Sequence, residues 1–141
     1  MSAEKQVPLF FCHRTEPEYV QRFLMLERAF RPFGDTFFLF DNAADALPAS
    51  ISKVRHFPFS LKSLQTLGYS WRHGKLIPGD GHFPVHSFFM AHPHYSHYWV
   101  IEYDVYLFGP WRLFFHLHLS LAQTLPSRSS WHAHCPLQGS A

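Results

Sequence analysis

The feature that most constrains this chain is a pair of short, continuous apolar runs separated by a segment with helical spacing. Residues 7–12 and 36–40 are almost entirely apolar, and between them, in residues 19–30, apolar side chains recur every three or four positions. A run that is apolar throughout is typical of a strand buried on both faces, as in parallel sheets. Thr15 is the predicted N-cap of the helix, which should end before Pro32. Strand, helix and strand in this order predict a βαβ unit.

Further elements can be placed downstream. Residues 54–59 resemble a third strand that Pro58 interrupts, and Pro84 is expected to begin a short helix that stops near Pro93. Residues 98–103 are strongly β-prone, and we expect them in the middle of the sheet. Together these elements predict an α/β fold with a mostly parallel, Rossmann-like sheet and flanking helices.

The composition narrows the classes of protein to consider. The chain has 141 residues, of which 47% are hydrophobic, so it can form one domain with a substantial core. Its formal net charge is +2 and its basic residues are scattered, which argues against nucleic acid as a partner. No apolar run is long enough for a transmembrane segment, and two cysteines form no disulfide framework, so we expect a soluble protein of the cytoplasm.

The character of the sequence changes after about residue 115. No Asp or Glu occurs beyond Asp104, although surface helices normally use carboxylates for solubility and capping. We therefore expect residues 1–115 to be the N-terminal portion of a domain that is incomplete at its C-terminus. Residues 116–141 are expected to be a non-conforming tail, either disordered or encoded by a shifted reading frame.

Two acidic residues close the predicted strand at 98–103. Glu102 and Asp104 are two positions apart, so on a strand they would point to the same side. Ligands of open parallel sheets bind at the carboxyl ends of the strands, and carboxylate oxygens suit Mg²⁺ or Mn²⁺. The spacing predicts a site for such an ion. The alternative is structural: Glu102 pairs with a nearby arginine and Asp104 caps a turn.

The same stretch resembles a known family. Residues 94–105, with the sequence His-Tyr-Ser-His-Tyr-Trp-Val-Ile-Glu-Tyr-Asp-Val, and the Gly-Pro-Trp at 109–111 resemble the central segment of GT-A-type glycosyltransferase-like proteins. Residues 8–14 are similar to the first strand of that family, and residues 79–84 to the loop before its short helix. The resemblance covers roughly residues 7–115.

The resemblance implies a domain that binds a nucleotide-diphosphate sugar with Mg²⁺ or Mn²⁺. Glu102 and Asp104 would be the metal ligands, while His13, Arg14 and Asp41 would flank the nucleotide. The commoner motif has Asp where this chain has Glu102, and the second half of the family's fold has no counterpart after residue 115. The chain is therefore expected to bind a donor without being a complete glycosyltransferase.

Two other functions remain open. The chain could be a non-catalytic remnant or interaction protein, whose half-built sheet would leave an apolar edge that favours self-association. It could also be a small histidine-rich metal-binding protein, because it has 12 histidines, several of them clustered. Neither cysteine has a partner at the spacing of a zinc site, so solvated or core histidines are the simpler interpretation. The basic residues 71–75 could face a phosphate or form an ordinary surface loop. The clustered histidines are His82, His86, His92, His94 and His97.

Overall fold

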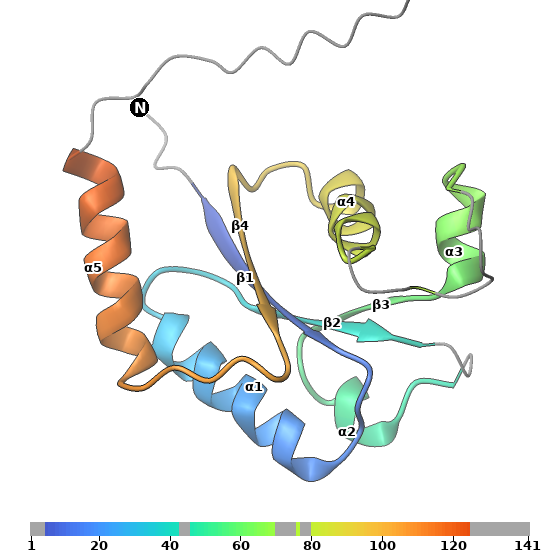
Figure 1. The fold of residues 1–141 in the computed structure, drawn as a ribbon, viewed down its shortest axis with the longest axis horizontal. Coiled ribbons are helices and arrows are strands. Elements are labelled where there is room, and N and C mark those ends of the chain that lie inside the picture. Colours follow the sequence, from blue (N-terminus) through green and yellow to red (C-terminus); the bar gives the residue numbers. More distant parts are fainter. Residues whose placement is uncertain (1–4, 43–45, 70–75, 77–79, 125–141) are drawn as a thin grey trace, which may run out of the picture.

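The computed structural model describes residues 5–42, 46–69, 76 and 80–124, and its centre is a sheet of four parallel strands in the order β3-β2-β1-β4 (Figure 1). All three neighbouring pairs are parallel, and parallel pairing requires the long crossover connections that join these strands. The strands are β1 (Gln6–Cys12), β2 (Phe37–Asp41), β3 (His56–Phe59) and β4 (His97–Glu102).

Helices cover both faces of this sheet (Figure 1). One face packs against α1, α2 and α5, and the other against α3 and α4. The fold is therefore an α/β arrangement of three layers with a coarse Rossmann-like organisation, as the sequence predicted. The helices are α1 (Pro17–Phe30), α2 (Ala49–Ser52), α3 (Leu61–Thr66), α4 (His82–Ala91) and α5 (Trp111–Thr124).

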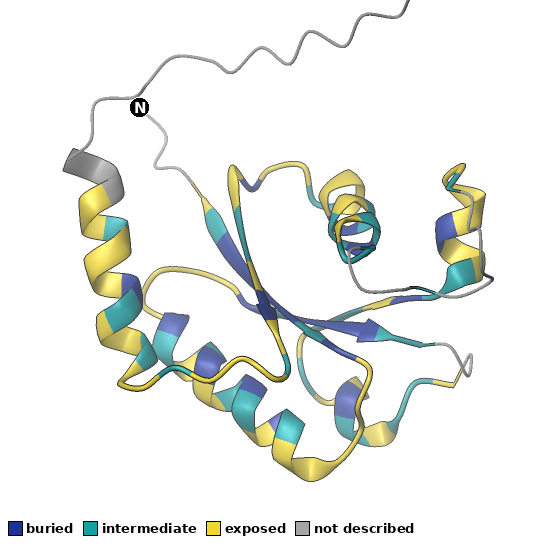
Figure 2. Ribbon diagram, viewed as in Figure 1, coloured by how far each residue is buried: buried dark blue, intermediate teal, exposed yellow. Residues whose placement is uncertain are grey.

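The continuous apolar runs are explained by two separate cores. Along β1, the side chains of Val7 and Leu9 enter the core beneath α3 and α4, whereas those of Phe10 and Cys12 enter the core beneath α1 and α5. Figure 2 shows β1 and β2 as the most continuously buried strands. Because alternate side chains of a strand point to opposite faces, a strand covered on both sides must be apolar at nearly every position.

Helix α1 has the expected amphipathic pattern but a different first turn. Its buried residues recur at Val20, Phe23, Leu26 and Phe30. The predicted N-cap, Thr15, is wrong by one position: Glu16 is the N-cap and makes no side-chain cap bond. Pro17 occupies the first helical position, where the missing N–H costs nothing, so the turn can form without a capping side chain.

Two later expectations also need correction. Helix α4 begins at His82, so Pro84 lies within its first turn and is not its first residue. Strand β4 pairs with β1 alone among the described strands and is therefore at the edge of the sheet, where Val100 is exposed. Strong β propensity does not decide strand order, because edge and central strands use the same residue types. At the opposite edge, β3 accommodates Pro58, as expected of an edge strand.

Helix α5 crosses the predicted boundary at residue 115. We expected local disorder from about residue 116, yet the helix continues to Thr124. Phe115 is fully buried against Phe30, and Leu119 packs against the same core. Residues 116–124 are thus part of the helix that covers this face, while 125–141 lie outside the described residues. The division into a domain of residues 1–115 and a foreign tail stays a prediction.

No helix within the described residues combines the length and apolar character needed to cross a membrane.

Candidate functional site at the carboxyl ends of the strands

The candidate residues predicted from the sequence lie at the carboxyl ends of neighbouring strands. Cys12 of β1 pairs with Phe40 of β2, and Phe11 pairs with Glu102 of β4. Asp41 is the last residue of β2, Glu102 is the last residue of β4, and His13 and Arg14 follow β1. The parallel register therefore brings these residues to adjacent positions at the carboxyl end of the sheet.

The order in which the chain forms the strands reverses direction across the sheet between β1 and β4. From β1 the chain moves through α1 to β2 and through α2 to β3, and it then returns by way of α3 and α4 to β4 on the other side of β1. Helices α1 and α2 cover one face and α3 and α4 the other. In open α/β sheets such a switch point leaves a crevice at the carboxyl ends of the strands, where ligands bind. Here the switch point lies between β1 and β4.

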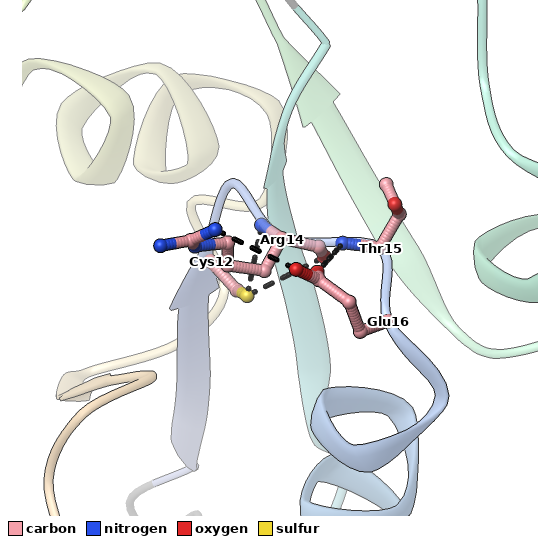
Figure 3. A network of polar contacts seen from close by, with 4 residues as sticks. All are labelled: Cys12, Arg14, Thr15 and Glu16. Atoms are coloured by element: carbon pink, nitrogen blue, oxygen red, sulfur yellow. Dashed lines mark hydrogen bonds and ion pairs between the residues drawn. The ribbon is translucent and has the colours of Figure 1, made fainter.

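The end of β1 is shaped by a small polar network (Figure 3). The backbone N–H of Arg14 donates to the sulfur of Cys12 at 3.2 Å, and the N–H of Thr15 donates to Oε2 of Glu16 at 3.0 Å. Nη1 of Arg14 lies 3.5 Å from Oε1 of Glu16. Burial raises the pKa of the Cys12 thiol to about 11. Cys12 is thus a neutral, structural thiol that helps to hold the turn, and Arg14 and Glu16 stay exposed above it.

The end of β4 is a turn, which corrects one premise of the predicted metal site. The N–H of Tyr103 still donates to the carbonyl of Phe11 at 3.0 Å, but the N–H of Val105 donates to the carbonyl of Glu102 at 3.0 Å and reverses the chain. The strand ends at Glu102, so Asp104 lies in the turn. Alternation along a strand therefore does not determine how the two carboxylates are related.

Both carboxylates are exposed, and neither side chain forms a hydrogen bond or ion pair with any described residue. The structural alternative, in which Glu102 pairs with an arginine and Asp104 caps a turn, is accordingly not what the described part of the chain contains. Two carboxylates at the switch point remain available to a ligand.

Tyr103 connects the two strand ends, and sequence reasoning assigned it no role. Its ring centre lies 4.9 Å from that of His13 and 5.5 Å from that of Tyr19, both in edge-to-face arrangements. A side-chain hydrogen bond with Tyr103, followed by the charge of Glu16, raises the pKa of Arg14. The carboxyl ends of β1 and β4 thus bring together a cation, several rings and the two carboxylates. In the sequence, the only indication of these contacts was that a tyrosine stands between Glu102 and Asp104.

Asp41 and its neighbour Asn42 mark the end of β2. Asp41 is partly exposed, and the N–H of Asn42 donates to the carbonyl of Phe59 at 2.7 Å. The side-chain Oδ1 of Asn42 is buried without a hydrogen-bond partner in the described part of the chain. Buried acceptors of this kind usually have a partner, so Asn42 is a second residue that sequence reasoning overlooked.

The described residues contain no group of three or more His, Cys, Asp or Glu side chains that could hold a metal ion by themselves. A zinc site, which needs at least three protein ligands, therefore has no support in the described part of the chain. Mg²⁺ differs, because it is commonly held by one or two carboxylates together with water and substrate phosphates. Exposed Glu102 and Asp104 fit that second kind of site.

The clustered histidines have structural surroundings. Tyr69 and His86 share a hydrogen bond through the phenol oxygen and Nδ1. His92 packs against the rings of Phe37 and Phe88, and burial lowers its pKa. Trp99 also has structural contacts: its indole N–H donates to Oε1 of Gln6 at 2.8 Å, and its ring packs on α5. The basic residues 71–75 lie outside the described residues.

Comparisons with family models, curated proteins and solved structures find no match for this chain.

Proposed function

We propose that the region between the carboxyl ends of β1 and β4 binds a nucleotide-diphosphate sugar together with Mg²⁺ or Mn²⁺, in the manner of a GT-A-type glycosyltransferase-like domain. The observation that carries this proposal is the position of Glu102 and Asp104. They are two exposed carboxylates without described partners, at the switch point of a parallel sheet. Polar groups at such a point are better explained by a ligand than by the fold.

The chemistry of the surrounding residues suits a diphosphate. Glu102 and Asp104 would hold the ion, which neutralises phosphate charge when it is bound. Arg14 adds positive charge at the end of β1, and His13 lies beside it. Asp41, at the end of β2, would receive hydrogen bonds from hydroxyl or amide groups of the nucleotide.

Binding without sugar transfer is the expected behaviour of this chain. Transfer requires an oriented acceptor hydroxyl and usually a base that removes its proton. The sequence has no carboxylate after Asp104 that could act as this base. As the low cysteine content suggests, we propose that the protein works in the cytoplasm.

Calorimetry with uridine and guanosine diphosphate sugars tests the proposal. We expect binding in Mn²⁺ and none in EDTA. Asp104→Asn should weaken it by roughly 1 to 3 kcal/mol, the range for a lost charge-assisted contact. Glu27→Gln, near the C-terminal end of α1, is the matched control and should leave the affinity unchanged. Equal binding in EDTA would remove the metal, and no binding of any nucleotide would favour a non-catalytic interaction protein.

A further inference from the structure

A cavity lies on the α1 face of the sheet, beside the first turn of α5. It has a volume of about 300 Å³ and lies between α1, the segment that joins β4 to α5, and the start of α5. Its inner wall is formed by the buried side chains of Phe10, Leu26 and Ile101. Exposed apolar side chains form its rim, namely Met25, Val105 and Tyr106. The cavity is at the small end of the size range of ligand pockets.

The one charged residue in its lining, Arg22, is already engaged. Nη1 and Nη2 of Arg22 donate to the backbone carbonyls of Tyr103 and Val105, and its guanidinium carbon lies 4.0 Å from the centre of the Tyr106 ring. These contacts attach the β4–α5 segment to α1. Because the charge is spent on the protein's own backbone, the cavity presents an apolar interior and suits an apolar occupant rather than a phosphate.

The β4–α5 segment also carries an apolar projection. Phe108 is completely exposed, with a relative accessibility of 103%, and both of its neighbours, Leu107 and Gly109, line the cavity. Most of this segment is exposed (Figure 2). Together with the exposed rim of the cavity, Phe108 forms an apolar patch, and such patches often mark interaction sites.

We propose that the occupant of this cavity is Phe108 of a second copy of the chain. A projection and a hollow on one segment form a self-complementary surface, and a two-fold axis between them would seat each Phe108 in the other copy's cavity. Aromatic side chains that fill a pocket at the centre of an interface commonly dominate binding. The rim residues Met25, Val105 and Tyr106 would close around each inserted ring.

The dimer should be weak. The proposed contact is confined to one connecting segment and the outer side of α1, and interfaces that bury less than roughly 1,200 Å² in total are typically weak. We therefore expect an equilibrium between monomer and dimer that shifts with protein concentration. This inference does not depend on the proposed nucleotide-sugar site, because none of its residues is a proposed metal or nucleotide ligand.

Sedimentation equilibrium of the full chain over a range of concentrations is the first measurement. The wild type should dimerise, and Phe108→Ala and Met25→Glu should each raise the dissociation constant at least tenfold. Met90→Ser removes an apolar side chain of α4 that is as exposed as Met25 but lies on the other face, and it should leave the dissociation constant unchanged. Circular dichroism would verify that each variant is folded, as expected for changes at exposed positions.

A mixing experiment separates this geometry from general stickiness. The Phe108→Ala copy retains an intact cavity, and the Met25→Glu copy retains an intact Phe108. A labelled mixture of the two should form a heterodimer at concentrations where each alone is monomeric. A monomeric wild type, a Met90→Ser variant that weakens association as much as Phe108→Ala, or a mixture without heterodimer would each overturn the proposal. A monomeric wild type that binds a fluorescent apolar dye, with binding lost in Met25→Glu, would assign the cavity to a small molecule instead.

Discussion

The two ends of the sheet use their polar side chains differently. At the amino end, Asp35 forms an ion pair with Arg55 and accepts a hydrogen bond from the Tyr95 hydroxyl at 3.0 Å. These residues precede β2, β3 and β4 and lie 20 and 60 positions apart in the sequence. At the carboxyl end, Glu16 has only local polar contacts, Arg14 contacts Glu16 and, across the strand ends, Tyr103, and Glu102 and Asp104 have no described partner.

We interpret this difference as one between a structural end and a proposed binding end. Polar groups that satisfy one another over long sequence distances hold the strand starts together, and little is left for a ligand. Groups that the fold leaves without partners are available for binding, and their loss should cost little stability. The following predictions test this distinction, from the largest expected effect to the smallest.

The largest effect should come from truncating one tyrosine at each end. Tyr95 is 6% exposed and packs against Phe37 and Phe88, whereas Tyr103 is only partly buried. Tyr95→Ala should lower the free energy of unfolding by about 3 to 5 kcal/mol, as for other buried aromatic residues, and Tyr103→Ala by only about 1 kcal/mol. Urea unfolding of both variants measures this, and equal losses would erase the distinction.

Cys12 tests how deep the binding end extends. Its pKa of about 11 lies above the ordinary value of 9.0 because the thiol is buried. In a Cys135→Ser background, Cys12 should react with a disulfide reagent at pH 8 on the order of 100-fold more slowly than in the urea-unfolded chain. Because burial raises the folded-state pKa of the thiol, the contribution of the neutral thiol to the free energy of unfolding is complete below pH 9 and is lost as pH rises towards 11. Rapid reaction of the folded chain would mean that the reagent reaches the end of β1, where Cys12 is buried.

The ion pair at the amino end should show itself in acid. The hydrogen bond from Arg55, followed by the bond from Tyr95, lowers the pKa of Asp35 below its ordinary value of 3.8. The stabilisation is therefore present above pH 3.8 and is lost as pH falls through the lowered pKa. Asp35→Asn should cost on the order of 1 kcal/mol at pH 7 and nothing near pH 2. Thermal melts across this range measure the effect, with Asp104→Asn, an exposed carboxylate without a described partner, as the control. Equal losses at pH 7 for both variants would mean that the ion pair is unimportant.

The smallest effect is expected at the proposed metal ligands. The double variant Glu102→Gln, Asp104→Asn removes two exposed charges without described partners, so the free energy of unfolding should change by less than about 0.5 kcal/mol. The same variant should lose metal-dependent nucleotide-sugar binding. A loss of 2 kcal/mol or more in stability, measured by urea unfolding, would assign these carboxylates to the fold.

Much of the fold and part of the site could be predicted from local patterns. Residues 7–12 and 36–40 had to be buried on both faces because they carry no polar side chain that could face water, apart from the terminal Thr36. The helical spacing over residues 19–30 predicted α1 for the same reason, since its apolar stripe must meet a sheet. Once the strands were parallel, His13, Arg14, Asp41 and Glu102 had to reach one edge. These inferences succeed because burial and chain direction are written in the order of neighbouring residues.

The remaining features depend on residues that are distant in the sequence. Whether β4 is central or at the edge depends on which strands pair with it, and its β-prone residues do not encode this. Helix α5 continues past residue 115 because Phe115 and Leu119 meet a surface formed by residues far upstream. Arg22 reaches the carbonyls of Tyr103 and Val105 across 81 and 83 positions. Contacts of this length exist only after the chain has closed, so tertiary structure decides them and no local pattern predicts them.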